Sequence, residues 1–238
     1  MDPLLGKGLY SIPEAARIIR ATGVCSGSTS NVRNWAVGYN RRHKGDVRHY
    51  SPLLLQGAQQ IDGDYYLTFL QLLECRMIGK FRDYGVSVAA IRAAVSVMSD
   101  RFGVQHPFAL RRLWTDGKRI YTDVVPKRLK DTGMRDGDVM HDIVSGQGAF
   151  DSVRDFFLNN IDYTDGVPDR LWPLGHESGI VIDPQRSFGR PIDAATGISS
   201  SVLYSMCKGG TPAEDVAKWH GATTQVVKAS VEFESLAA

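Results

Sequence analysis

Cysteine is scarce in this chain, which contains only Cys25, Cys75 and Cys207 among its 238 residues. The three thiols are odd in number and far apart, so they do not indicate a disulfide framework. No Cys-x-x-Cys or Cys/His spacing typical of a zinc site occurs. We therefore expect reduced thiols in an intracellular protein that uses no metal and no cofactor.

Long apolar runs are also missing. No stretch approaches the roughly 18 consecutive apolar residues of a membrane-spanning helix, and the first residues lack the charged-then-apolar pattern of a signal peptide. We expect a cytoplasmic protein without a membrane segment. Hydrophobic residues make up 43% of the chain and charged residues 23%, which is enough to build a core and argues against wholesale disorder.

Catalytic signatures are absent as well. The sequence has no G-x-S-x-G, P-loop, Rossmann glycine pattern or H-E-x-x-H. One local group of acids with a histidine has the composition of a divalent-metal site, but it falls on an Asp-Gly turn, where solvated acids are common. That group consists of Asp136, Asp138, His141 and Asp142. We expect no enzyme, no catalytic residue and no metal site.

The net charge of +2 conceals an asymmetry. Up to Leu110 the chain has 13 Lys/Arg and 8 Asp/Glu, a net charge of +5, whereas the remainder has 15 and 18, a net charge of −3. A basic N-terminal part suits a polyanion as partner. The acidic remainder needs a different role.

Two short helices are predicted near the N-terminus. Ser11 and Glu14 have the spacing of a capping box. The apolar positions that follow at helical spacing are Ile12, Ala15, Ala16 and Ile19. A second helix begins at Ser28, Thr29 or Ser30. Its predicted apolar stripe consists of Val32, Trp35, Ala36 and Tyr39.

The second helix and the residues after it are basic. Between residues 17 and 48 there are seven Lys/Arg and one acid, Asp46. Such a helix pair fits a helix-turn-helix that enters a DNA major groove. Arg33 and Asn34 would reach base edges, because Arg favours guanine and Asn favours adenine; hydroxyls at the helix start and the basic residues beyond it would hold phosphates. The candidate DNA-binding residues are Thr29, Ser30, Asn31, Arg33, Asn34, Arg41, Arg42, Lys44 and Arg48. The alternative is a structural helical hairpin with a solvated charged face.

Two runs in this region resemble the start of a MerR-type winged helix. They are Tyr10-Ser11-Ile12-Pro13-Glu14-Ala15-Ala16 and Thr29-Ser30-Asn31-Val32-Arg33-Asn34-Trp35, although the spacer between them, residues 21–28, is longer than in that family. The segment 47–66, with its polar turn Asp62-Gly63-Asp64, fits the β-wing of such a domain, with Arg48 and His49 at its base near phosphates. A plain surface hairpin is the alternative for this segment.

The next residues predict an antiparallel helix pair and then a β-rich region. Helical periodicity runs from residue 66 to 84, and a second helix starts after Ser87 and ends near Gly103. Asp-Gly pairs then mark turns at residues 116, 136 and 165, with one short helix around Phe156. We expect a winged-helix domain at residues 1–108 and a β-hairpin-rich connecting domain at residues 109–176.

The last part, residues 177–238, predicts a small three-helix domain. Ile180-Val181-Ile182 reads as a strand and residues 183–191 as a loop. Helices are expected to start at Ser199 or Ser200, at a Thr-Pro-Ala-Glu capping box beginning at Thr211, and at Thr224. Tyr204 and Trp219 are expected in the three-helix core. The predicted fold class is therefore α+β and mainly helical.

This tail resembles a domain of unknown function found in type II antitoxins. The residues that carry the resemblance are Ile180, Ile182, Asp183, Pro184, Gly189, Arg190, Pro191, Ile192, Gly209, Thr211, Val216, Val227 and Phe233. The family usually has Gly-Thr-Arg-Ile-Pro after this first segment, but residues 195–199 read Ala-Thr-Gly-Ile-Ser here and the arginine is missing. Together with the N-terminal resemblance, this implies a VapB-type antitoxin. Such a protein binds and inhibits a cognate PIN-like ribonuclease toxin and represses its own operon by binding operator DNA, here as a homodimer.

The loop before residue 191 provides the candidate toxin contacts. A PIN-like nuclease has an acidic, metal-binding cleft, so a basic and aromatic insert would block it. The candidates are Arg186, Phe188 and Arg190. Alternatively, Phe188 packs under the loop and Arg190 forms a structural ion pair with Asp183.

A second functional class remains open from the sequence. A MerR-like transcriptional regulator would sense a small molecule through its middle and C-terminal parts and would need no toxin. It predicts a DNA affinity that depends on a ligand, whereas the antitoxin predicts one that depends on a partner protein. A bare adaptor without a DNA role is disfavoured by the basic charge between residues 17 and 48.

Overall fold

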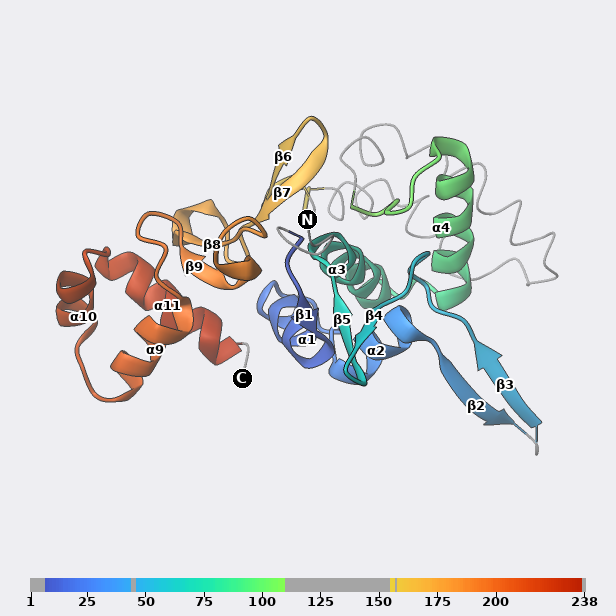
Figure 1. Cartoon of the computed structure of the whole chain (residues 1–238), viewed down its shortest axis with the longest axis horizontal. Helices are drawn as coiled ribbons and strands as arrows, with labels where there is room; N and C mark the ends of the chain where they lie inside the picture. The colour runs from blue at the N-terminus through green and yellow to red at the C-terminus, as the bar shows by residue number, and fades with distance from the viewer. Residues whose placement is uncertain (1–6, 44–45, 110–154, 157, 237–238) are drawn as a thin grey trace.

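The computed structural model describes residues 7–43, 46–109, 155–156 and 158–236, and it is a mixed α+β fold (Figure 1). The described helices include α1 (Ile12–Ala21), α2 (Thr29–Val37), α3 (Phe69–Asp83), α4 (Val88–Phe102), α9 (Ser200–Lys208), α10 (Ala213–His220) and α11 (Thr224–Leu236). The strands are β1 (Tyr10–Ser11), β2 (Tyr39–His43), β3 (Asp46–Tyr50), β4 (Gln59–Ile61), β5 (Asp64–Leu67), β6 (Ile161–Thr164), β7 (Val167–Leu171), β8 (Ile180–Ile182) and β9 (Pro191–Asp193). The expected α+β class is confirmed.

The predicted N-terminal helix pair is present. The backbone N–H of Glu14 donates to the Ser11 side chain over 3.4 Å, which caps α1. Of the three candidate caps for α2, Ser28 is the one used: its hydroxyl accepts the Asn31 N–H at 3.2 Å. The α2 residues that pack into the core are Val32, Trp35 and Ala36. The prediction was wrong for Tyr39, which is the first residue of β2, because the chain leaves the helix at Gly38.

Two hairpins follow where the sequence predicted one. The expected wing forms around Asp62-Gly63, where β4 and β5 pair and β1 adds a third strand in the order β1-β5-β4. Arg48 and His49 do not lie at its base, and that placement was wrong. They belong to a separate two-stranded ribbon, β2–β3, which projects from the body of the molecule (Figure 1).

Helices α3 and α4 match the predicted pair. Thr68 and Gln71 form a capping box at the start of α3, and the Ser87 side chain accepts the Ala90 N–H at 3.1 Å at the start of α4. The main hydrophobic core lies between α1, α2, α3 and α4. Phe233 of α11 and Leu171 of β7 are buried in the same core.

The β-rich region is described only from residue 155 onward. The Asp-Gly turn at residue 165 forms the hairpin β6–β7, as predicted. The turns predicted at residues 116 and 136, and the acid and histidine group at residues 136–142, lie outside the described residues. The sheet extends across the boundary expected at residue 176, because β7 pairs with β8, and the result is a four-stranded antiparallel sheet in the order β6-β7-β8-β9.

The three C-terminal helices form around a smaller core that includes Leu203, Val216 and Val227. The capping box predicted at Thr211 does not form, because Pro212 occupies the cap position of α10 and no side chain accepts a hydrogen bond there. Trp219 was wrongly expected in this core: 63% of its surface is exposed. Tyr204 is half-buried.

The C-terminal helices dock on the N-terminal helix pair. Arg17 Nη1 of α1 lies 2.7 Å from Glu234 Oε2 of α11, and the Ser200 hydroxyl donates to the other oxygen of Glu234 at 2.5 Å. The Tyr10 hydroxyl donates to the Gly189 carbonyl at 3.0 Å. The loop before β9 is thus held against the first strand of the helix-turn-helix region. No helix within the described part of the chain is long and apolar enough to cross a membrane.

Candidate nucleic-acid interface and partner-binding loop

The β2–β3 ribbon is a basic arm, and we use that name for residues 39–43 and 46–50. Its register places Arg41 opposite Arg48 and Arg42 opposite Val47. Arg41 and Arg48 therefore share one face of the ribbon, and Arg42 points to the other face. All three arginines are exposed. Both faces of the arm thus present positive charge to solvent.

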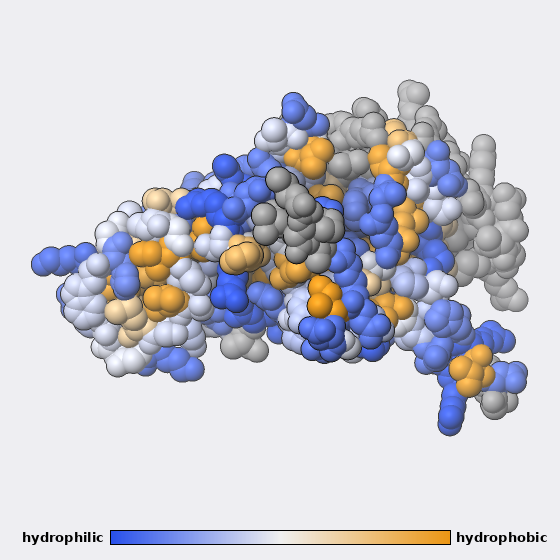
Figure 2. Space-filling model, in the orientation of Figure 1, coloured by the Kyte–Doolittle hydropathy of each residue, from blue (hydrophilic) through white to orange (hydrophobic). Residues whose placement is uncertain are grey.

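The arm lacks the features that stabilise an ordinary sheet. Like charges directly opposite each other, such as Arg41 and Arg48, destabilise a strand pair. Val47 is 61% exposed and lies near the tip, where Figure 2 shows an apolar spot surrounded by hydrophilic surface. At the base of the arm, ring stacking offsets part of this charge repulsion: the Tyr39 and Tyr50 rings stack with centroids 4.8 Å apart. A polyanion between the arginines would relieve the repulsion.

The junction between α2 and the arm is sterically defined. Gly38 has φ 83°, and a Cβ atom there would lie 2.4 Å from the Tyr50 carbonyl oxygen. After the arm, the chain returns to the end of α2, where the Trp35 carbonyl accepts the Leu53 N–H at 2.7 Å and the Ala36 carbonyl accepts the Ala58 N–H at 2.9 Å. These contacts fix the base of the arm relative to α2.

The candidate residues of α2 divide into two groups. Thr29, Ser30 and Arg33 are exposed, and the Arg33 guanidinium carbon lies 5.4 Å from the centroid of the Tyr65 ring on β5. Asn31 is directed back into the turn, because its side-chain amide donates to the Ser26 carbonyl at 2.9 Å. Asn34 is half-buried. The accessible face of α2 therefore carries Thr29, Ser30 and Arg33.

The arm begins directly after α2 and projects outward from the end of that helix (Figure 1), so the exposed face of α2 and the arm, with Arg41, Arg42 and Arg48, are consecutive along the chain; we call them together the basic edge. Lys44 lies outside the described residues. The wing β4–β5 differs, because its turn carries the exposed acids Asp62 and Asp64. Acidic side chains at that turn do not favour a phosphate contact.

Sequence reasoning missed the arm as a structural unit. Charge identifies the basic residues, but the sequence prediction assigns Arg48 to the base of the wing and includes no hairpin at residues 39–50. The pair Gly45-Asp46, in the middle of the basic run between Tyr39 and Tyr50, was the available signal for a hairpin turn.

The loop between β8 and β9 displays Phe188. Ser187 and Phe188 both adopt left-handed backbone conformations, with φ 48° and 56°, and Phe188 is 79% exposed. Non-glycine residues adopt this conformation at an energetic cost, and they keep it only where the surroundings enforce it. Here the Arg190 N–H donates to the Ser187 carbonyl at 3.1 Å and Tyr10 holds Gly189. Phe188 therefore does not pack under the loop.

The two loop arginines have different environments. Arg186 donates from Nη1 to the Ala194 carbonyl at 2.9 Å, so part of its guanidinium is used within the loop. Arg190 is exposed, and it does not pair with Asp183, whose Oδ2 lies 3.3 Å from Arg170 Nε. Burial raises the pKa of Glu14, and the charges of Arg17 and Arg190 partly oppose that rise. Phe188 and Arg190 are thus the loop residues presented outward.

Metal chemistry has no visible support in this part of the molecule. Within residues 7–43, 46–109 and 158–236, no group of three or more His, Cys, Asp and Glu side chains is arranged to hold a metal ion. Cys75 is buried, and burial raises the pKa of its thiol well above the usual range, which makes it unreactive.

Residues 8–95 match a protein family described as "Putative DNA-binding HTH domain". The chain is also 24% identical to "Putative antitoxin VapB45" of Mycobacterium tuberculosis (strain ATCC 25618 / H37Rv), over 94% of this chain and 92% of that protein. The similarity to that relative runs along nearly the whole length of both chains. The resemblance to a VapB-type antitoxin inferred from the sequence is confirmed, as is the N-terminal helix-turn-helix.

The fold has a solved counterpart. The crystal structure of Rv2018 from Mycobacterium tuberculosis superposes with a TM-score of 0.69 at 21% sequence identity, covering 93% of this chain and 96% of that chain. At this identity the likeness concerns the fold. It extends through both the helix-turn-helix region and the C-terminal helices, so the docking of one on the other belongs to a known architecture.

Proposed function

We propose that this chain is an antitoxin that binds and inhibits a cognate PIN-like ribonuclease toxin, and that it represses the operon encoding both proteins. The observation that carries the proposal is the near full-length similarity to a relative named as an antitoxin, in a chain whose N-terminal part matches a DNA-binding family. The basic edge and the exposed loop supply separate surfaces for the two activities.

DNA binding is assigned to α2 and the arm. Arg33 enters the major groove from the accessible face of α2 and reads base edges. Thr29 and Ser30 hold a phosphate at the start of the helix, and the arm arginines contact the backbone on either side of the ribbon. One module makes few contacts, so we propose a homodimer that binds two half-sites about 34 Å apart or a multiple of that distance.

Toxin inhibition is assigned to Phe188 and Arg190. An exposed aromatic side chain on a constrained backbone loses little entropy on binding, which favours its use as an anchor. Arg190 complements the acidic cleft of a PIN-like nuclease and competes with RNA for it. Arg186 contributes less, because its guanidinium already holds Ala194.

Co-expression with the adjacent reading frame tests the proposal. Only this chain carries a tag, and the neighbour is also expressed alone. We expect a small nuclease to co-purify with this chain and to arrest growth when expressed without it. A harmless neighbour that does not co-purify would contradict the toxin assignment, while DNA binding would still be measurable on the purified chain.

A further inference from the structure

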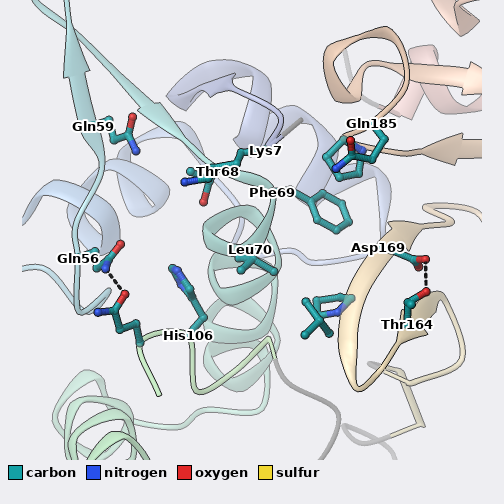
Figure 3. A pocket seen from close by; sticks show the side chains of 14 residues that line it. Lys7, Gln56, Gln59, Thr68, Phe69, Leu70, His106, Thr164, Asp169 and Gln185 are labelled. Carbon is teal, nitrogen blue, oxygen red and sulfur yellow. Dashed lines mark hydrogen bonds between the residues drawn. The ribbon is translucent and has the colours of Figure 1, made fainter. Parts of the chain in front are cut away.

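A cavity of about 510 Å³ lies at the junction of three parts of the molecule. Its walls come from the start of α3, from the loop after α4, and from the hairpin β6–β7 together with the turn after β8 (Figure 3). Pockets of about 300–1,000 Å³ typically hold small organic ligands. The cavity is separate from the arm, and although Pro184 and Gln185 of the β8–β9 loop line it, Phe188 and Arg190 of that loop do not.

The middle of the cavity is apolar. Phe69 and Leu70 line it from α3, and Val167 and Pro168 line it from the opposite hairpin. Val167 is 48% exposed although it lies in a wall of this cavity, so apolar surface remains available there. A flat apolar ligand group bound between these walls would shield that surface from water.

At one end of the cavity lie two basic side chains, His106 and Lys7, and a buried carboxylate holds His106 in position. His106 Nδ1 lies 2.9 Å from Glu74 Oε2, and Glu74 is 2% exposed and also accepts the Phe108 N–H at 3.4 Å. A carboxylate that accepts from Nδ1 fixes the orientation of the imidazole, and in an imidazolium the second N–H, on Nε2, is left to donate to another partner. Lys7 lines the same end, beside Thr68 (Figure 3). These groups favour an anion.

The other end presents an acceptor. Asp169 lies across the cavity from Lys7 and His106 (Figure 3). Its Oδ2 accepts the Thr164 hydroxyl at 2.8 Å, whereas its Oδ1 is buried without a hydrogen-bond partner. A buried carboxylate oxygen without a partner is costly. A ligand hydroxyl at this end of the cavity would add a second donor to the Asp169 carboxylate, beside the one that Thr164 supplies.

We propose that this cavity binds a small aromatic carboxylate that carries a hydroxyl at the far end of its ring. The carboxylate binds Lys7 and His106, the ring lies between Leu70 and Val167, and the hydroxyl donates to Asp169. The site adds a small-molecule activity to the DNA and toxin contacts, and it uses none of their residues.

The test uses the full chain and three matched probes in calorimetric titrations. The first is 3-(4-hydroxyphenyl)propionate, the second is its neutral carboxamide, and the third is 3-phenylpropionate, which lacks the hydroxyl. We expect saturable binding of the first and at least about tenfold weaker binding of the other two, because each loses a hydrogen bond to a charged group. Equal binding of all three, or no saturable binding of the first, would overturn the proposal.

Substitutions test which residues bind the carboxylate and which bind the hydroxyl of the probe. Lys7→Met and His106→Gln are expected to weaken the hydroxyphenyl probe by about tenfold each, with Lys208→Met on the exposed face of α9 as the matched control. Asp169→Asn is expected to remove the preference for the hydroxyl while leaving 3-phenylpropionate unchanged. Because Lys7 is exposed, Lys7→Met folds normally even if His106→Gln disturbs Glu74. Unchanged affinity in Lys7→Met would overturn the placement of the carboxylate.

Discussion

The helix-turn-helix region and the C-terminal part differ in whether their charged side chains face partners of opposite charge. On the arm, Arg41 and Arg48 face each other without an acid between them. In the C-terminal helices some charges are paired with acids: Lys228 lies 3.5 Å from Glu214, and Glu234 is held by Arg17. The C-terminal part also exposes two aromatic side chains, Phe188 on the loop before β9 and Trp219 on α10. This contrast is the reason why we propose a polyanion as the partner of the arm and a protein as the partner of the C-terminal part.

The largest expected effect comes from reversing charge on the arm. The double change Arg41→Glu, Arg48→Glu should abolish measurable DNA binding, because it removes two phosphate contacts and adds two repulsive charges. It should not lower the free energy of unfolding, since a like-charge pair is replaced by another of the same kind. Fluorescence anisotropy with operator DNA over a range of salt measures the first effect, and thermal denaturation measures the second.

The control for the arm is Lys218→Glu together with Lys208→Glu, two exposed lysines on the C-terminal helices. This variant has the same net charge as the arm variant. If binding depended only on net charge, both variants would lose affinity equally, and the distinction between the two regions would fail.

The second expected effect concerns the aromatic surface. Phe188→Ala should weaken toxin binding by about 2 kcal/mol, the value typical of an aromatic interface anchor. DNA affinity should stay the same. Stability should also stay the same, because Phe188 is largely exposed and contributes little to the core. Calorimetry with the purified toxin makes the measurement.

Trp219→Ala is the matched control for Phe188, because it also removes an exposed aromatic side chain. Trp219 lies on a regular helix, whereas Phe188 lies on a strained loop held by Tyr10. A loss of toxin affinity in Trp219→Ala but not in Phe188→Ala would move the interface from the loop to α10. A loss in both would extend it over both elements.

The third expected effect separates specificity from affinity within the basic edge. Arg33→Ala should reduce discrimination at one base pair by about 1–3 kcal/mol. Arg42→Ala should weaken binding to all sequences and lower the slope of log affinity against log salt by about 1. Binding to the operator and to a scrambled duplex distinguishes the two. Equal loss of sequence preference in both variants would refute the assignment of Arg33 to base reading.

Local signals in the sequence predicted the helices well, and long-range packing explains where prediction failed. Ser28 and Ser87 were recognisable caps because a cap depends on residues three positions away. Trp219 was misplaced because periodicity shows that a helix has an apolar side, but not whether another element covers it. The contact between Tyr10 and Gly189 joins positions 179 residues apart, which no local pattern records.

The candidate site residues could also be predicted only where they depend on local sequence, and not where they depend on long-range packing. The arginines of the arm were identified from charge, but their division between two faces of a ribbon depends on the register of β2 and β3. Conversely, the exposure of Phe188 could not be predicted, because an aromatic residue in a loop is buried or exposed according to its backbone conformation. Ser187 and Phe188 are left-handed only because Tyr10 and the turn at Asp183 constrain both ends of the loop.

The smallest expected effect tests whether the arm must be positioned as well as charged. Gly38→Ala introduces a Cβ 2.4 Å from the Tyr50 carbonyl oxygen, so the arm must shift relative to α2. Gly23→Ala is the matched control: Gly23 has φ 78°, close to the 83° of Gly38, but nothing lies within 4 Å of its added Cβ. Gly23→Ala should lose about 1 kcal/mol of stability from backbone strain, and Gly38→Ala should lose more, because its Cβ also meets backbone atoms. Only Gly38→Ala should lose affinity for the operator while keeping its affinity for scrambled DNA, because the arginines remain but no longer reach their phosphates in register with α2. If the two variants bound the operator equally well, the arm would act through its charge alone, and the geometry of the junction would have no role in recognition.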